Sequence, residues 1–236
     1  MQIPPLLDRC SFIQILAYQS SRKVLPFIYL MVYVFKVFSG RLHEITGVIM
    51  SVLREKILHV ASDLFQTRGI NSTGVDTIVA VAGTTKMTLY KYFHSKEELI
   101  LEVLQKGHQD FQSWLSDKLA NSTKKPSEKL QKLFDFIEEW VTAPDFRGMA
   151  FIKASAEFPN EENPVHRLSA EQSRQFRHYL AELAVDAGVK DADGLALQLS
   201  LLIEGSMQAE QMKRGSGAIK YAKKAAKILI ESALKG

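Results

Sequence analysis

Residues 75–99 read VDTIVAVAGTTKMTLYKYFHSKEEL, which is the pattern of two short helices joined at a glycine. The first segment places apolar residues at helical spacing on one face, and these are Val75, Ile78, Val79 and Ala82. Gly83 follows them, and glycine permits the left-handed backbone that ends a helix sharply. The hydroxyl of Thr84 or Thr85 can then cap the second helix.

The second helix carries little apolar surface, since Leu89 and Phe93 alone share a face. Its other positions are Lys86, Met87, Thr88, Tyr90 and Lys91. Lysines neutralise phosphate or reach guanine acceptors, and hydroxyls donate to phosphate oxygens, so this surface suits DNA. The alternative is an ordinary helical hairpin with a solvated polar face.

A third helix is expected just upstream. Its apolar face is Ile57, Val60, Ala61, Leu64 and Phe65. Arg68 and Gly69 close it, and three such helices bury one small core.

Residues 54–104 resemble the DNA-binding domain of the TetR family of bacterial transcriptional regulators. The positions that carry the match are Phe65, Gly69, Ile78, Ala82, Gly83, Leu89, Tyr90, Tyr92, Phe93, Lys96 and Leu99. The resemblance implies an all-α fold, in which a three-helix DNA-binding domain with a helix-turn-helix precedes a larger helical ligand-binding and dimerisation domain.

The resemblance also implies which residues contact DNA. Thr85, Lys86, Met87 and Thr88 fall on recognition-helix positions, and Tyr90, Tyr92 and Lys96 fall on phosphate-contacting positions. Lys91 and His94 are further candidates. The chain departs from the family pattern at Gly74, where a capping hydroxyl is common, at Thr84, which replaces a usual valine, and at Asp76. We interpret Asp76 as an acid favoured by the helix dipole rather than as a DNA contact.

Residues 1–49 differ in character from the rest, because they are rich in aliphatic and aromatic residues, most of all from Val24 to Phe38. Three interpretations remain: a translated upstream region with Met50 as the true start, a membrane-tethering helix, or a helix packed on the core. We therefore divide the chain into an apolar extension (1–49), a helix-turn-helix domain (50–97) and a helical ligand-sensing and dimerisation domain (98–236).

Helical periodicity continues to the end of the chain, and no segment alternates as a strand. The expected helices cover residues 99–119, 126–142, 146–158, 165–187, 193–207 and 219–233. The helix from Asp193 to Met207 is apolar around most of its circumference, and the last helix carries a stripe of small residues. Both features suit a dimer interface and an internal position about equally, and the resemblance tips the choice toward a homodimer.

Two sets of residues follow for the larger domain. Candidate ligand contacts are Phe111, Trp114, Phe134, Met149, Phe151, Phe176, Tyr179 and Glu204. Candidate dimer contacts are Leu195, Leu199, Leu202, Ile203, Ile219, Ala222, Ala226 and Leu229. Glu157 and Glu204 stand out as polar groups among apolar neighbours, with an intersubunit salt bridge or hydrogen bond as the alternative use of Glu204.

Composition sets weaker bounds. A net charge of +4 permits nucleic-acid binding, and a single cysteine, Cys10, favours the cytoplasm over an oxidising compartment. We find no catalytic, cofactor-binding or metal-binding motif. The sequence therefore predicts a cytoplasmic, ligand-responsive repressor that binds near-palindromic double-stranded operator DNA as a homodimer and is released by a small apolar or amphipathic effector. The alternatives are a membrane-tethered regulator or adaptor that uses residues 1–49, and a helical enzyme.

Overall fold

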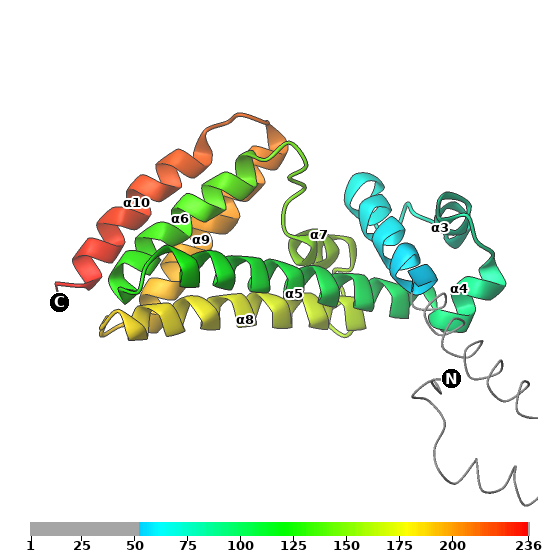
Figure 1. Cartoon of the computed structure of the whole chain (residues 1–236), viewed down its shortest axis with the longest axis horizontal. Helices are drawn as coiled ribbons and strands as arrows, with labels where there is room; N and C mark the ends of the chain where they lie inside the picture. Colours follow the sequence, from blue (N-terminus) through cyan, green and yellow to red (C-terminus); the bar gives the residue numbers. More distant parts are fainter. Residues whose placement is uncertain (1–51, 236) are drawn as a thin grey trace, which may run out of the picture. The chain divides into compact units, whose positions relative to one another are not determined.

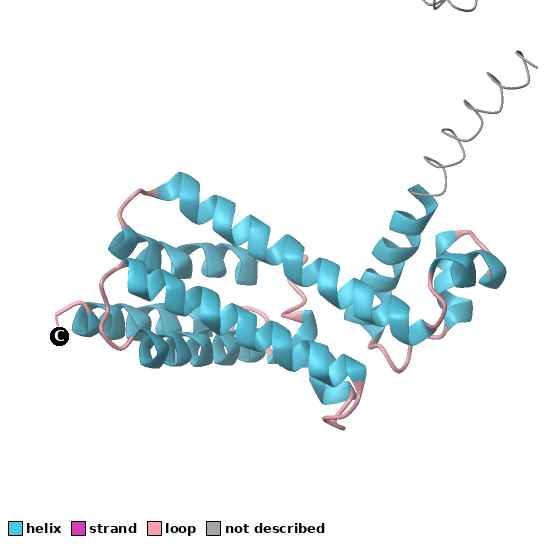
Figure 2. Cartoon of the chain, turned by 90° about the horizontal axis from the view of Figure 1, so that it is seen from below, coloured by secondary structure: helices cyan, strands magenta, loops and turns pink. Residues whose placement is uncertain are grey.

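The structure is a computed structural model that describes residues 52–235. The first described helix covers residues 52–68. The helices that follow are α3 (Val75–Ala82), α4 (Lys86–Tyr92), α5 (Lys96–Ser122), α6 (Pro126–Thr142), α7 (Ala150–Glu157), α8 (Pro164–Asp186), α9 (Ala192–Met212) and α10 (Ala218–Ala233) (Figure 1). Within residues 52–235 the chain forms helices and loops without strands, which confirms the all-α prediction (Figure 2).

Helix 52–68, α3 and α4 form a small helix-turn-helix unit around one core. Its central side chains are fully buried, and they are Ile57, Ala61, Ile78, Leu89 and Phe93. Gly83 adopts φ 65°, the left-handed conformation that the sequence predicted for the turn between α3 and α4. The direction of α4 is therefore set both by the glycine turn and by its two buried apolar side chains.

The long helix α5 connects this unit to the rest of the chain. It begins after Ser95, whose hydroxyl accepts a hydrogen bond from the Glu98 backbone N–H at 3.0 Å. Its 27 residues span about 40 Å at the usual rise of an α-helix. Leu99 near its start and Leu119 near its end are both buried, so one rigid element contributes to both cores.

Helices α6, α8, α9 and α10 pack with the second half of α5 into a large bundle. Figures 1 and 2 both show α5 and α8 side by side. The short helix α7 packs on α8 and α5, and it inserts Phe151 and Ala154 into buried positions. The bundle therefore buries one face of α7 and leaves its other side chains for contacts elsewhere.

Two of the predicted helices differ from the structure by four or more residues at one end. The helix expected over 146–158 begins only at Ala150, because Gly148 at φ 83° belongs to the preceding loop. Helix α9 continues to Met212, beyond the predicted end at Met207. No helix in residues 52–235 is long and apolar enough to cross a bilayer. The interpretations of segment 1–49 lie outside the described residues, and the three-part domain division stays a prediction.

Candidate nucleic-acid interface

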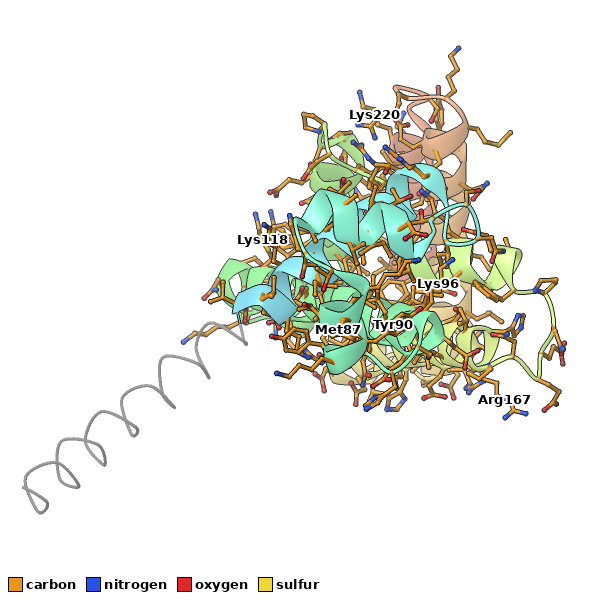
Figure 3. All side chains as sticks on the ribbon, turned by 90° about the vertical axis from the view of Figure 1, so that its right-hand side faces the viewer. Met87, Tyr90, Lys96, Lys118, Arg167 and Lys220 are labelled. Atoms are coloured by element: carbon orange, nitrogen blue, oxygen red, sulfur yellow. The ribbon has the colours of Figure 1, made fainter. Side chains whose placement is uncertain are left out.

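Helix α4 turns its apolar side chains inward and presents its polar surface to solvent. Leu89 is completely buried, whereas Met87 is 82% exposed and Tyr90 is 44% exposed. Figure 3 looks toward this end of the molecule and labels Met87 and Tyr90 on α4. The exposure of these side chains supports presentation of this helix to a partner.

Thr85 fixes the start of α4. Its hydroxyl accepts a hydrogen bond from the Thr88 backbone N–H at 3.2 Å, and the two threonine hydroxyls lie 3.0 Å apart. Of the two hydroxyls that the sequence offered as a cap, the structure therefore uses Thr85 rather than Thr84. Thr85 is exposed and Thr88 is half-exposed, so DNA could reach both hydroxyls.

Lys86 is held by an ion pair across the helix-turn-helix. Its Nζ lies 2.7 Å from a carboxylate oxygen of Asp76, in the first turn of α3. The hydrogen bond that Lys86 donates to Asp76 raises the pKa of Lys86 above its ordinary value, so the side chain stays charged. In the DNA-free protein Asp76 therefore competes with any phosphate or base for Lys86.

The remaining predicted DNA residues fall into two groups. Lys91 is exposed at the end of α4, and Tyr92 is half-buried beside Phe93, with ring centroids 6.4 Å apart. His94 and Lys96 already have partners, because the His94 backbone N–H and ring bond to Glu98 at 2.6 and 2.9 Å. Lys96 donates to the Ile70 carbonyl at 2.7 Å, and burial lowers its pKa. A phosphate contact by Lys96 requires it to leave or share that carbonyl.

Comparison with known proteins agrees with this geometry. The sequence model described as "Bacterial regulatory proteins, tetR family" matches residues 57–103. A solved TetR-family transcriptional regulator from Streptomyces coelicolor, SCO4454, superposes with a TM-score of 0.74 at 27% identity, covering 78% of this chain and 97% of that one. Residues 57–103 are therefore a TetR-type DNA-binding domain.

Sequence relatives carry matching names. YjdC of Escherichia coli K12, named an HTH-type transcriptional regulator, is 23% identical over 180 residues, which cover 76% of this chain and 94% of YjdC. KstR2 of Mycolicibacterium smegmatis, named a transcriptional repressor, is 36% identical over 84 residues, or 34% of this chain and 39% of KstR2. FasR of Mycolicibacterium smegmatis, named a transcriptional activator, is 36% identical over 88 residues, or 36% of this chain and 40% of FasR. The chain is therefore a helix-turn-helix transcriptional regulator.

The predicted ligand residues are only partly brought together. Phe111, Trp114 and Phe176 belong to an aromatic cluster that also contains Trp140 and Phe146, and its ring centroids lie 4.7 to 6.4 Å apart. Phe134, Met149 and Phe151 are buried in the core of the bundle, and Tyr179 packs at its edge. Glu204 lies elsewhere, on the partly exposed side of α9, where burial raises its pKa and Arg177 of α8 opposes that shift.

Tyr179 also lines a groove between α5 and α8. The groove has a volume of about 760 Å³, and its other lining residues are Gln109, Gln112, Ser113, Ser116, Glu171, Arg174, Gln175, His178 and Glu182. Tyr179 was among the predicted ligand contacts, but the other groove residues were not, because they come from two helices that are distant in the sequence. One side chain therefore touches both the core and a polar groove.

Six of the eight predicted dimer residues are buried within the single chain. They are between 0% and 7% exposed, and they are Leu195, Leu199, Ile203, Ile219, Ala222 and Ala226. The chain's own helices cover these side chains and leave them little surface for a second subunit, and the dimer assignment stays a prediction. Leu202 and Leu229 are half-buried and keep some free surface.

The exposed apolar residues of α9 and α10 were not in the predicted set. Leu197 is 46% exposed and Leu201 is 61% exposed on α9, while Tyr221 and Ile228 are 73% and 68% exposed on α10. The sequence signal was present, because residues 197 and 201 are one helical turn apart. On a helix that is apolar all round, however, spacing alone does not tell the face toward the chain's own core from the face toward a partner.

Proposed function

We propose that this regulator is a homodimeric repressor that binds near-palindromic operator DNA through α4 and releases it when a small amphipathic molecule binds the large bundle. The proposal rests on the two faces of α4. One face is buried through Leu89, and the other exposes Met87 and Tyr90 to solvent. A protein that repressed in this way would act in the cytoplasm, where operator DNA lies.

The residues proposed to touch DNA are Thr85, Lys86, Met87, Thr88 and Tyr90, with Lys91, Tyr92, His94 and Lys96 at the edge of the contact. Lysine and hydroxyl groups suit phosphate and base edges, and an exposed methionine suits a thymine methyl group. A recognition helix inserted in the major groove accounts for this mixture better than a solvated surface does, because solvation gives no reason to expose Met87.

The proposed dimer interface is the exposed apolar face of α9 and α10, defined by Leu197, Leu201, Tyr221 and Ile228. The two helices pack on each other, so these side chains lie on neighbouring elements of the bundle. Exposed apolar patches of this kind mark contact with another protein. A second copy supplies an identical patch, and two-fold symmetry then sets two α4 helices on successive turns of DNA, about 34 Å apart.

The proposed effector site lies where the aromatic cluster meets the groove between α5 and α8. Phe111 and Trp114 are partly exposed and offer apolar surface, and Tyr179 and Gln175 offer polar groups on the facing helix. Such a combination suits a molecule with one apolar and one polar end. Because α5 joins this region to the helix-turn-helix unit, a ligand that favours a different position of α5 changes DNA affinity by population shift.

The test is operator selection from a random DNA library with the full-length dimer, repeated with Lys86→Ala and Tyr90→Ala. We expect Lys86→Ala to change the preferred sequence and Tyr90→Ala to weaken binding to all sequences alike. The control is Lys124→Ala, which removes an exposed lysine from the loop between α5 and α6. Unchanged selection in both α4 variants would refute the assignment of α4.

The repressor part of the proposal has its own measurement. Placing the selected operator across a promoter should lower transcription when the protein is present. Higher transcription from the same template would instead identify an activator, as one relative is named. A compound that binds the bundle without changing operator affinity would contradict the effector part.

A further inference from the structure

A carboxylate from α7 holds the turn that leads into the helix-turn-helix. The two oxygens of Glu157 accept hydrogen bonds from consecutive backbone N–H groups, those of Ile70 at 2.9 Å and Asn71 at 2.7 Å. The Asn71 side chain returns a hydrogen bond to the Glu157 carbonyl at 3.1 Å. Glu157 and this turn are more than 80 positions apart in the sequence, so the contact joins two distant segments.

Two lysines add hydrogen bonds in the opposite direction, since they donate to backbone carbonyls where Glu157 accepts from backbone N–H groups. Lys153, one helical turn before Glu157, donates to the Gln66 carbonyl at 3.3 Å, in the last turn of helix 52–68. Lys96 donates to the Ile70 carbonyl at 2.7 Å. Anions are favoured at free N–H groups and cations at the carbonyl end of a helix, so each charge meets the backbone dipole that suits it.

Helix α7 thereby links the turn to the core of the bundle. Phe151 is 7% exposed in that core, and its ring lies edge-on to His108 of α5 at 6.4 Å between centroids. Ala154 on the same helix is fully buried. Since interiors are close-packed, α7 cannot shift without moving these neighbours. Its last residue, Glu157, bonds to the turn of the helix-turn-helix unit.

We propose that Glu157 is a positioning residue, which fixes the orientation of the helix-turn-helix unit relative to the bundle. The buried start of α5, including Leu99, attaches the unit to one helix of the larger domain. The contacts from α7 attach it to a second helix, and Glu157 supplies two of their hydrogen bonds, so the angle depends on both attachments. This proposal rests on the proposed function, because in a dimer that angle sets the separation of the two α4 helices on DNA.

The first experiment measures amide hydrogen exchange in the full-length protein carrying Glu157→Gln. A glutamine has nearly the same shape but one acceptor oxygen, so only one of the two amides keeps a partner. Loss of a hydrogen bond to a charged group predicts exchange about tenfold to a hundredfold faster at the turn of Ile70 and Asn71. The control is Glu161→Gln, which neutralises an exposed glutamate in the next loop. Unchanged exchange at the turn would overturn the proposal.

The second experiment separates positioning from mere stabilisation. Affinity for a single operator half-site depends on one helix-turn-helix unit, whereas preference among full operators with different spacers depends on the angle of both units. We expect Glu157→Gln to leave half-site affinity within about twofold of the parent and to broaden the range of spacers bound. Equal spacer preference in the variant and the parent would overturn the positioning role.

A third measurement needs no DNA, so it distinguishes this proposal from the proposed function. A spin label at Val81→Cys, in a Cys10→Ser background, reports the distance between the two units of a dimer. Val81 is 56% exposed near the end of α3, and Cys10 is the chain's single cysteine. We expect Glu157→Gln to widen the distance distribution, even if no operator is ever found. An unchanged width would refute the positioning role.

Discussion

Leu89 is the apolar side chain that anchors α4, and its replacement by alanine should weaken DNA binding without unfolding the large bundle. It is the one buried residue among the seven of α4, and Phe93 just beyond the helix is the second anchor. A fully buried leucine replaced by alanine costs about 2–5 kcal/mol. We expect about 3 kcal/mol, since a helix at the surface relaxes into part of the space.

That cost has a direct consequence for α4. At about 1.4 kcal/mol per factor of ten, 3 kcal/mol makes local opening of α4 about a hundredfold more frequent. Operator affinity falls with the fraction of molecules in which α4 is ordered. We therefore expect Leu89→Ala to weaken operator binding about tenfold or more, and to leave α8 and α9 as protected as before.

The assay combines operator binding by fluorescence anisotropy with hydrogen exchange of the α4 amides. The matched control is Val81→Ala in α3, because Val81 is 56% exposed and is not among the proposed DNA contacts, so its loss should change stability by less than about 0.5 kcal/mol. Full operator affinity and protected α4 amides in Leu89→Ala would refute the anchoring argument.

Three further predictions concern charge and assembly. Asp76→Asn should tighten operator binding about two- to fivefold in anisotropy titrations, since it frees Lys86 and exposed ion pairs are weak; weaker binding would show that Asp76 orients Lys86 for its contact. Leu201→Glu should give monomers in sedimentation, because Leu201 is 61% exposed and the change spares the chain's own core; an intact dimer would place the interface elsewhere. Burial raises the pKa of Glu204, so its contribution to stability is most favourable below the ordinary pKa of glutamate and is lost as pH rises through the raised value. Glu204→Gln should flatten that part of a melting-temperature profile between about pH 4 and 8, and an unchanged profile would contradict this origin.

Local pattern was enough to predict the helix-turn-helix. Gly83 and the pair Leu89 and Phe93 act within a few residues of themselves, so their spacing already determines the turn and the buried side of α4. The start of α6 at Pro126 and the cap of α8 near Gly188 were predictable for the same reason. The fold class followed from such local signals together with the resemblance to the family.

Contacts between distant segments could not be predicted in this way. The pairing of Lys86 with Asp76, and of Lys96 with the Ile70 carbonyl, depends on how the helices cross. On α9 the periodicity could not decide between Leu199, which is buried, and Leu201, which is exposed, because both flanks of that helix are apolar. The sequence singled out Glu157 and Glu204 for the same reason, their apolar neighbours, and only the structure shows that their roles differ. Glu157 accepts hydrogen bonds from a backbone turn, whereas Glu204 lies on the partly exposed side of α9.

The aromatic cluster gives the protein a built-in optical reporter. Both of its tryptophans, Trp114 and Trp140, lie in that cluster with ring centroids 6.4 Å apart, and the helix-turn-helix unit contains none. Intrinsic tryptophan emission therefore comes from the large bundle alone. A compound that enters the cluster should shift or quench that emission in the unlabelled protein, while melting of the DNA-binding end alone should leave it largely unchanged. Candidate effectors can thus be titrated without a dye. A change in the wavelength or intensity of tryptophan emission assigns their binding to the large bundle.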